Sequence, residues 1–81
     1  MDIQLIQGNF SGKDALEIIT QMYHVKIKYH EGKISHRSNE EDVKFREAKI
    51  KSLQKDLFDV RKFIENAGGK INIQGDIHLS K

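Results

Sequence analysis

The sequence predicts a two-layer α+β domain in the order strand, helix, helix, strand. In this βααβ plan a long antiparallel helical hairpin packs on a small antiparallel sheet made by the N- and C-terminal strands. Two observations predict the class. Apolar residues recur at steps of three and four, or their sum, over residues 38–66, which is the period of one helix face. Both chain ends are short and β-leaning, and Gly, Asn or Ser residues separate them from the helical part.

The helix over residues 38–66 is the longest predicted element. At about 1.5 Å per residue it would extend about 42 Å, so the remainder of an 81-residue chain must pack against it. Ser38 and Glu41 have the spacing of a capping box, which predicts its start. Gly68 and Gly69 predict its end, because glycine adopts the left-handed conformation that closes helices. Its apolar positions are Val43, Ile50, Leu53, Leu57, Val60 and Ile64.

A strand and a second helix precede it. Residues 2–7 predict a strand that ends at the turn-forming pair Gly8 and Asn9. Ser11 is placed to cap a helix over residues 12–34, with Asp14 in its positively polarised first turn. One face of this helix carries Ala15, Ile18, Ile19, Met22, Val25 and Tyr29.

Residues 25–30 also fit a strand, because they alternate strictly between apolar and polar. A turn at Glu31 and Gly32 would then give the order βαββαβ, a ferredoxin-like plan. Nothing in residues 20–24 breaks the helix, however, and the long helix needs a partner of comparable length. We therefore favour a continuous helix of about 34 Å.

Residues 71–79 predict a half-buried strand. Ile71, Ile73, Ile77 and Leu79 share one face, and polar residues share the other. Gly75 falls on the apolar face, which indicates a bulge or the close approach of a helix. Residues 6–10 and 73–77 are similar in sequence. Coincidence is the favoured explanation, and two equivalent strands lying side by side are the alternative.

The composition is that of one small domain, residues 1–81. The chain has no cysteine and no proline, so packing or self-association must stabilise it. A net charge of +2 is too small to indicate nucleic acid binding by itself. Apolar runs of two or three residues exclude a membrane span, and the polar start does not resemble a signal peptide. We expect a cytoplasmic protein.

The first strand has apolar residues on both faces, with Ile3 and Leu5 on one and Ile6 and Phe10 on the other. A bulge near Leu5 would account for this pattern. The alternative, which we favour, is a homodimer, because two strands alone leave two open edges. Ile3, Leu5 and Ile6 are the candidate self-association residues.

Basic residues gather around the end of the first helix. Lys26, His30, Lys33 and Arg37 fall at steps of four, three and four and would form one stripe on a helix. Arg46 replaces an apolar residue near the same end of the hairpin, so its head group must reach a carboxylate, an anion or water. The stripe could bind an acidic protein partner or phosphate. A solvated helix face is the favoured alternative.

Metal and catalytic motifs are not recognisable. His24 and His30 are six residues apart, on different helix faces, and no histidine has a second ligand at a recognised spacing. The segment of residues 8–13 is too short for a phosphate-binding loop. The sequence therefore predicts no enzyme, cofactor or metal. It predicts a non-catalytic binding or assembly module, and the alternative is a nucleic-acid-binding protein without sequence specificity.

Phe10, Ser11 and Ala15, the run of residues 26–30 with Lys33, the long helix and the Ile-rich last strand together resemble a group of small uncharacterised bacterial proteins. The resemblance covers nearly the whole chain. It implies a strand, two helices and a strand, and it brings no activity, cofactor or functional residue.

Overall fold

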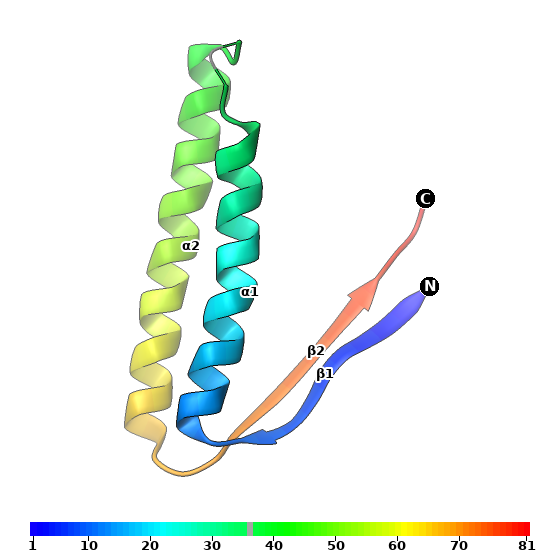
Figure 1. Ribbon diagram of the computed structural model, residues 1–81, viewed down its shortest axis with the longest axis vertical. Coiled ribbons are helices and arrows are strands. Elements are labelled where there is room, and N and C mark those ends of the chain that lie inside the picture. Colours follow the sequence, from blue (N-terminus) through cyan, green and yellow to red (C-terminus); the bar gives the residue numbers. More distant parts are fainter. Residues whose placement is uncertain (36) are drawn as a thin grey trace.

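The computed structural model describes residues 1–35 and 37–81 and contains four elements in the predicted order. They are β1 (Asp2–Phe10), α1 (Gly12–Lys33), α2 (Glu40–Ala67) and β2 (Ile71–His78). The helices form an antiparallel hairpin, and the two terminal strands form an antiparallel sheet (Figure 1). The predicted fold class is confirmed. The ferredoxin-like alternative is wrong, because residues 25–30 continue α1.

The hairpin is held together by a regular seam on α2. Its buried and half-buried positions are spaced alternately by three and four residues, as in a coiled coil. They are Val43, Arg46, Ile50, Leu53, Leu57, Val60 and Ile64. Half-buried residues of α1, among them Leu16 and Ile27, complete the contact between the helices. Outside the seam the helices carry many charged side chains, together with exposed apolar ones such as Val25, Phe45 and Phe63.

The helix ends are capped by short polar side chains. Ser11 Oγ accepts a hydrogen bond of 3.1 Å from the Asp14 N–H, which confirms the predicted cap of α1. The cap of α2 is Asn39, whose Oδ1 accepts from the Asp42 N–H at 2.8 Å, so the prediction of Ser38 is wrong. Ser38 Oγ instead accepts from the Ser35 N–H at 3.1 Å and stabilises the connection between the helices.

β1 contains a bulge at the predicted place. The pairing with β2 shifts between Gln4 and Ile6, which leaves Leu5 as the extra residue. The bulge brings Ile3, Ile6 and Phe10 to one face of the sheet, so the pattern of the first strand needs no second chain to explain it. The strand runs on through residues 8–9, and the predicted turn there is wrong.

The two similar segments of the sequence lie side by side in the sheet. Gln7 is opposite Gln74, Ile6 is opposite Gly75, and Gly8 is opposite Ile73. Each glycine thus faces an isoleucine across the strands. A Cβ atom on Gly75 would lie 3.3 Å from Ile6 Cγ2, so the cross-strand isoleucine occupies the space that a side chain would need.

The hydrophobic core lies at one end of the molecule, where the strands meet the helices. Ala15, Ile64 and Ile73 are buried there, and Ile6 and Phe10 pack against them. Beyond this core the sheet diverges from the hairpin, and the two form the arms of a V (Figure 1). The molecule is flat, with Cα extents of 46 × 32 × 13 Å. The outer half of the sheet is therefore not covered by its own helices.

Replacing Ile73 by alanine should lower the free energy of unfolding by about 2–4 kcal/mol, because the change leaves a cavity in the core where the two arms meet. Urea denaturation measures this loss. Phe63→Ala is the control, since Phe63 is exposed although its side chain is larger. An equal loss in the two variants would contradict the position of the core.

Candidate binding surfaces

A polar contact joins the helices near the end of the hairpin where the chain passes from α1 to α2. Arg46, half-buried in the seam, lies with its Nη1 atom 2.9 Å from His30 Nδ1. Arginine only donates hydrogen bonds, so Nδ1 must accept and the imidazole is neutral, with its hydrogen on Nε2. Desolvation, followed by the positive charges of Arg46, Lys49 and Lys26, lowers the pKa of His30 and favours the same neutral form. The sequence predicted that the head group of Arg46 would reach a carboxylate, an anion or water, but in the structure it contacts a histidine.

Tyr29 gathers cations around its exposed ring. The guanidinium carbon of Arg46 lies 5.7 Å from the ring centroid, and Lys33 Nζ lies 5.5 Å from it. The His30 ring meets Tyr29 edge to face at 5.3 Å between centroids. Such contacts orient the charged groups over aromatic carbon without neutralising them. The result is a cationic surface with an aromatic centre.

Two shallow hollows share this surface. The first, of about 390 Å³, is mostly apolar and is lined by Val25, Lys26, Tyr29 and His30. The second, of about 370 Å³, lies between the helices and is lined by Lys26, His30, Lys49, Ser52, Leu53 and Asp56. Within the described ranges, 1–35 and 37–81, neither Lys26 nor Lys49 forms an ion pair. Their ammonium groups are free to meet an anionic partner.

The structure brings together part of the predicted basic stripe. Lys26, His30 and Arg46 lie together, and Lys33 joins them as the last residue of α1. Arg37 lies beyond the helix, and its backbone N–H donates to Ser35 Oγ at 3.2 Å, so helical spacing does not place it in the stripe. We name Lys26, Tyr29, His30, Lys33, Arg46 and Lys49 the hairpin cluster. The sequence prediction missed Tyr29 and Lys49, although Lys49 follows Arg46 by one helical turn.

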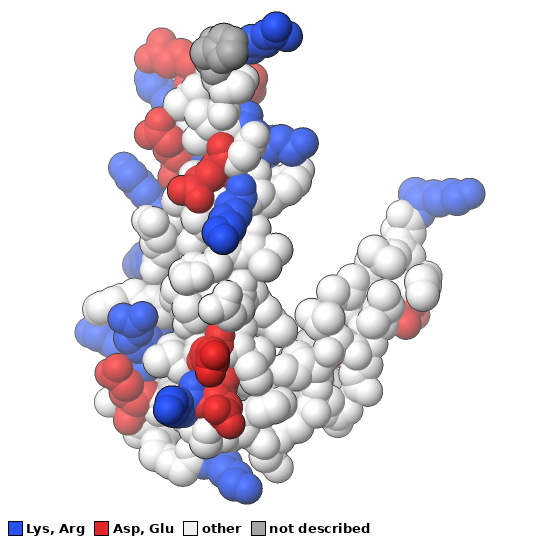
Figure 2. Space-filling view, viewed as in Figure 1, with Lys and Arg blue, Asp and Glu red and all other residues white. Residues whose placement is uncertain are grey.

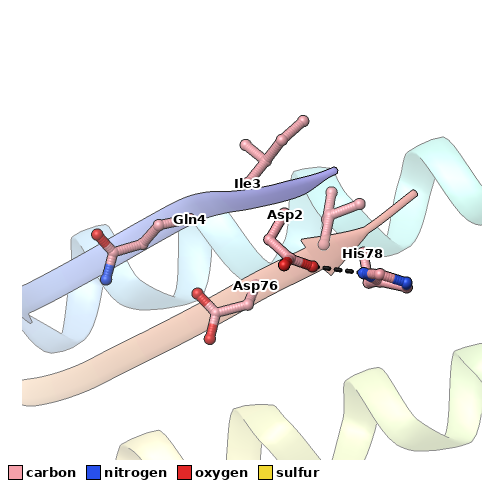
Figure 3. Close-up of a pocket in the computed structure, with 6 residues that line it drawn as sticks. Asp2, Ile3, Gln4, Asp76 and His78 are labelled. Carbon is pink, nitrogen blue, oxygen red and sulfur yellow. Dashed lines mark hydrogen bonds and ion pairs between the residues drawn. The ribbon is translucent and has the colours of Figure 1, made fainter. Parts of the chain in front are cut away.

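The sheet has one polar and one apolar face. Asp2 and His78 form a hydrogen-bonded pair on the polar face, and Asn72 Nδ2 donates to Asn9 Oδ1 at 3.0 Å. Figure 3 shows Gln4 and Asp76 on the side away from Ile3, at a shallow hollow near the free end of the sheet. Two cross-strand pairs on the polar face, Asp2 with His78 and Asn9 with Asn72, thus satisfy each other within the sheet.

The apolar face is uncovered at its outer end. Met1, Leu79 and Ile77 expose 78%, 52% and 39% of their surface. These residues continue the row formed by the buried Ile73 and the half-buried Ile71. The row therefore passes from the core into solvent without a change in its chemistry. We name Met1, Ile3, Ile77 and Leu79 the outer sheet face.

The predicted self-association residues occupy three different environments. Ile3 is half-buried on the outer sheet face, opposite Ile77. Leu5 is exposed in the bulge, and Ile6 packs against the core. Met1 and Leu79 were missed as candidates, although the alternation of residues 71–79 already placed Leu79 on the apolar side of its strand.

In the part of the chain that the structure describes, no three His, Cys, Asp or Glu side chains group as a metal site would require. Neither described helix combines the length and apolar character needed to cross a membrane. Comparisons with protein-family models, curated proteins and solved structures found no match. The resemblance to small bacterial proteins stays a prediction, and function must be inferred from the two surfaces.

The lowered pKa of His30 predicts a loss of stability in acid. The folded protein binds the His30 proton less strongly than the unfolded chain, where the pKa has its ordinary value of 6.5. The free energy of unfolding should therefore decrease as the pH falls below about 6.5 towards the lowered pKa of the folded state. In His30→Gln this part of the decrease should disappear, which urea denaturation between about pH 7.5 and pH 5.5 would measure.

His24→Gln is the matched control, because His24 is an exposed residue of the same helix. It should keep the pH dependence of the wild-type protein. If His30→Gln and His24→Gln gave the same slope as the wild type, protonation of His30 would not be linked to folding.

Proposed function

We propose that this protein is a non-catalytic, cytoplasmic binding and assembly module that self-associates through its sheet. The observation that carries the proposal is the outer sheet face, where a continuous apolar row leaves the core and lies open to water. Scattered apolar residues on a surface are ordinary, but a row along one face of a projecting arm indicates an interface. A second copy is the partner that would cover it.

The size of the chain supports self-association. An 81-residue domain without cysteines buries a small core, and a two-stranded sheet is marginally stable unless something covers it. The arm formed by the sheet also carries few charges on the side seen in Figure 2, whereas charged side chains gather over the helices. Association through the sheet therefore requires little desolvation of charge.

A second binding activity is proposed for the hairpin cluster, which would contact an acidic protein partner. Lys26, which is exposed, borders the apolar hollow together with the ring of Tyr29, and the exposed Lys49 borders the second hollow between the helices. This combination suits a peptide that carries both carboxylates and an apolar side chain. Nucleic acid is the alternative ligand, bound through its phosphates without base specificity.

Leu79→Asp should reduce self-association, because a carboxylate on the outer sheet face would have to be desolvated in the interface. Sedimentation velocity at micromolar concentration should show the wild type at twice the chain mass of 9.4 kDa and the variant at that mass. Phe45→Asp is the control. Phe45 is about as exposed as Leu79, at 54%, but it lies on α2 near the connection between the helices and not on the sheet. A wild type that remains at 9.4 kDa would contradict the proposal.

Lys49→Glu should weaken binding of a labelled polyglutamate peptide by roughly tenfold, as expected when one close charge contact becomes repulsive. Fluorescence anisotropy at low salt measures this change. Lys62→Glu is the control, because Lys49 and Lys62 lie over exposed phenylalanine rings in the same way, 5.5 Å from Phe45 and 4.7 Å from Phe58.

A single-stranded oligonucleotide separates the two kinds of ligand. If it binds in place of the peptide, and its affinity falls with salt by about one logarithmic unit of slope per phosphate contact, the alternative is supported. If neither probe binds at low salt, the hairpin cluster is a solvated surface and this second activity is refuted.

A further inference from the structure

The outer edge of β2 is open and regular. β1 carries the bulge at Leu5, which interrupts its edge, whereas β2 runs from Ile71 to His78 without one. β2 contains no proline, and Asp76 is its only acidic residue. Proteins usually protect such an edge with bulges, prolines or charges, and an unprotected edge is a template for another strand.

Hydrogen bonds at the end of the sheet identify the backbone groups on this edge. The amino group of Met1 donates to Leu79 O at 2.8 Å, and the Leu79 N–H donates to Met1 O at 2.7 Å. In an antiparallel sheet the direction of the backbone groups alternates along each strand. The backbone N–H and C=O groups of the odd-numbered residues of β2 therefore point towards β1. The residues that direct their N–H and C=O groups outward are Asn72, Gln74, Asp76 and His78.

We infer that two copies of the chain pair β2 with β2 in an antiparallel register centred on Gly75. This inference rests on the self-association proposed above and specifies its geometry. In this register Ile73 lies opposite Ile77 of the second copy, and Ile71 lies opposite its Leu79. On the polar face, Gln74 lies opposite Asp76 and Asn72 lies opposite His78. No like charges lie directly opposite each other across the join.

The sequence of β2 favours this register over both neighbouring ones. A register centred on Asp76 would place Asp76 opposite its own copy and Gly75 opposite Ile77. Shifting one copy of β2 by two residues keeps the apolar faces together and centres the pairing on Gln74. Ile73 would then lie opposite Gly75 of the second copy, and Leu79 opposite Gly69. Centring on Gly75 instead pairs every large apolar residue of residues 71–79 with another one. Cross-strand apolar pairs stabilise a sheet, whereas a glycine offers no side chain to contact.

The register also places the two exposed apolar residues of β2 and its end, Ile77 and Leu79, beside the more deeply buried Ile73 and Ile71. Ile77 of one copy becomes the neighbour of Ile73 of the other, which lies in the core under its own hairpin. The outer sheet face of each copy thus extends the core of its partner. The sheet becomes four-stranded, in the order β1, β2, β2, β1, which exceeds the three strands that a stable sheet usually needs.

The flat shape of the molecule leaves room for both hairpins. A twofold axis perpendicular to the sheet at Gly75 places the two hairpins on the same face. The two-stranded halves would be centred about 10 Å apart, which is the ordinary distance between packed helices. The shortest Cα extent of one copy, 13 Å, is close to this distance, so the two hairpins would lie in direct contact above the sheet.

Proline substitutions test which edge is joined. Gln74→Pro removes an outward N–H from β2 without breaking its bonds to β1, and it should reduce the dimer to a 9.4 kDa monomer in sedimentation velocity. Gln7→Pro is the matched control, because Gln7 lies directly opposite Gln74 and faces the other open edge. It should remain dimeric. A dimeric Gln74→Pro variant that keeps the helical circular dichroism of the wild type would overturn the inference.

Disulfide trapping tests the register without depending on the proline variants. The chain has no cysteine, so a variant with Asn72→Cys and His78→Cys contains only the introduced pair. These positions would lie about 5.5 Å apart between copies, which suits a disulfide. Mild oxidation should link the copies. A variant with Asn72→Cys and Asp76→Cys should link poorly, because those positions match only in the register centred on Gln74.

The outcomes separate the inference from the proposal beneath it. If the wild type is dimeric but the cysteine variants link through residues 72 and 76, or through neither pair, the register or the edge is refuted and self-association stands. A wild type that is monomeric by sedimentation at 100 µM refutes both. A dimer that links through residues 72 and 78 supports both.

Discussion

The structure depends on one packing constraint, which is that a single small core must hold two divergent arms together. Ala15, Ile64 and Ile73 are buried where the strands meet the helices, and the sheet leaves the hairpin directly beyond them. The hairpin is stabilised along its whole length by its own seam, but the sheet is covered over only half of its apolar face. A protein of this shape must either tolerate that exposure or bury the face against another chain.

The helices and strands could be predicted from sequence because each has a local signal. The three-four period of α2 and the serine cap of α1 depend on residues close together in the chain. The prediction of the cap of α2 failed because Ser38 and Asn39 are both suitable N-cap residues. The conformation of the connection between the helices decided between them. The divergence of the arms could not be predicted, because alternation shows which side chains share a face but not how far a neighbouring layer covers them.

The difference between local signals and the arrangement of whole elements also explains which parts of the candidate surfaces could be predicted. Helical spacing correctly brought Lys26 and His30 together, and the polar residue Arg46 in an apolar seam pointed to the same place. The structure added that Arg46 meets a neutral histidine, so the cluster has cations without bound carboxylates at its centre. Arg37 was misplaced because helical spacing was extended beyond the end of α1. A pattern of surface residues can therefore be predicted from the sequence only within one helix or strand.

Hydrogen exchange of the outward amides of β2 tests the central claim most directly, because these amides point away from β1 and have no backbone partner among the described residues of one copy. The account predicts that the amides of Asn72, Gln74 and Asp76 become protected as the protein concentration rises, while the Gln7 amide on the opposite edge continues to exchange rapidly. Rapid exchange of all four amides at every concentration would contradict it, and the sheet would then be an arm that remains open to solvent.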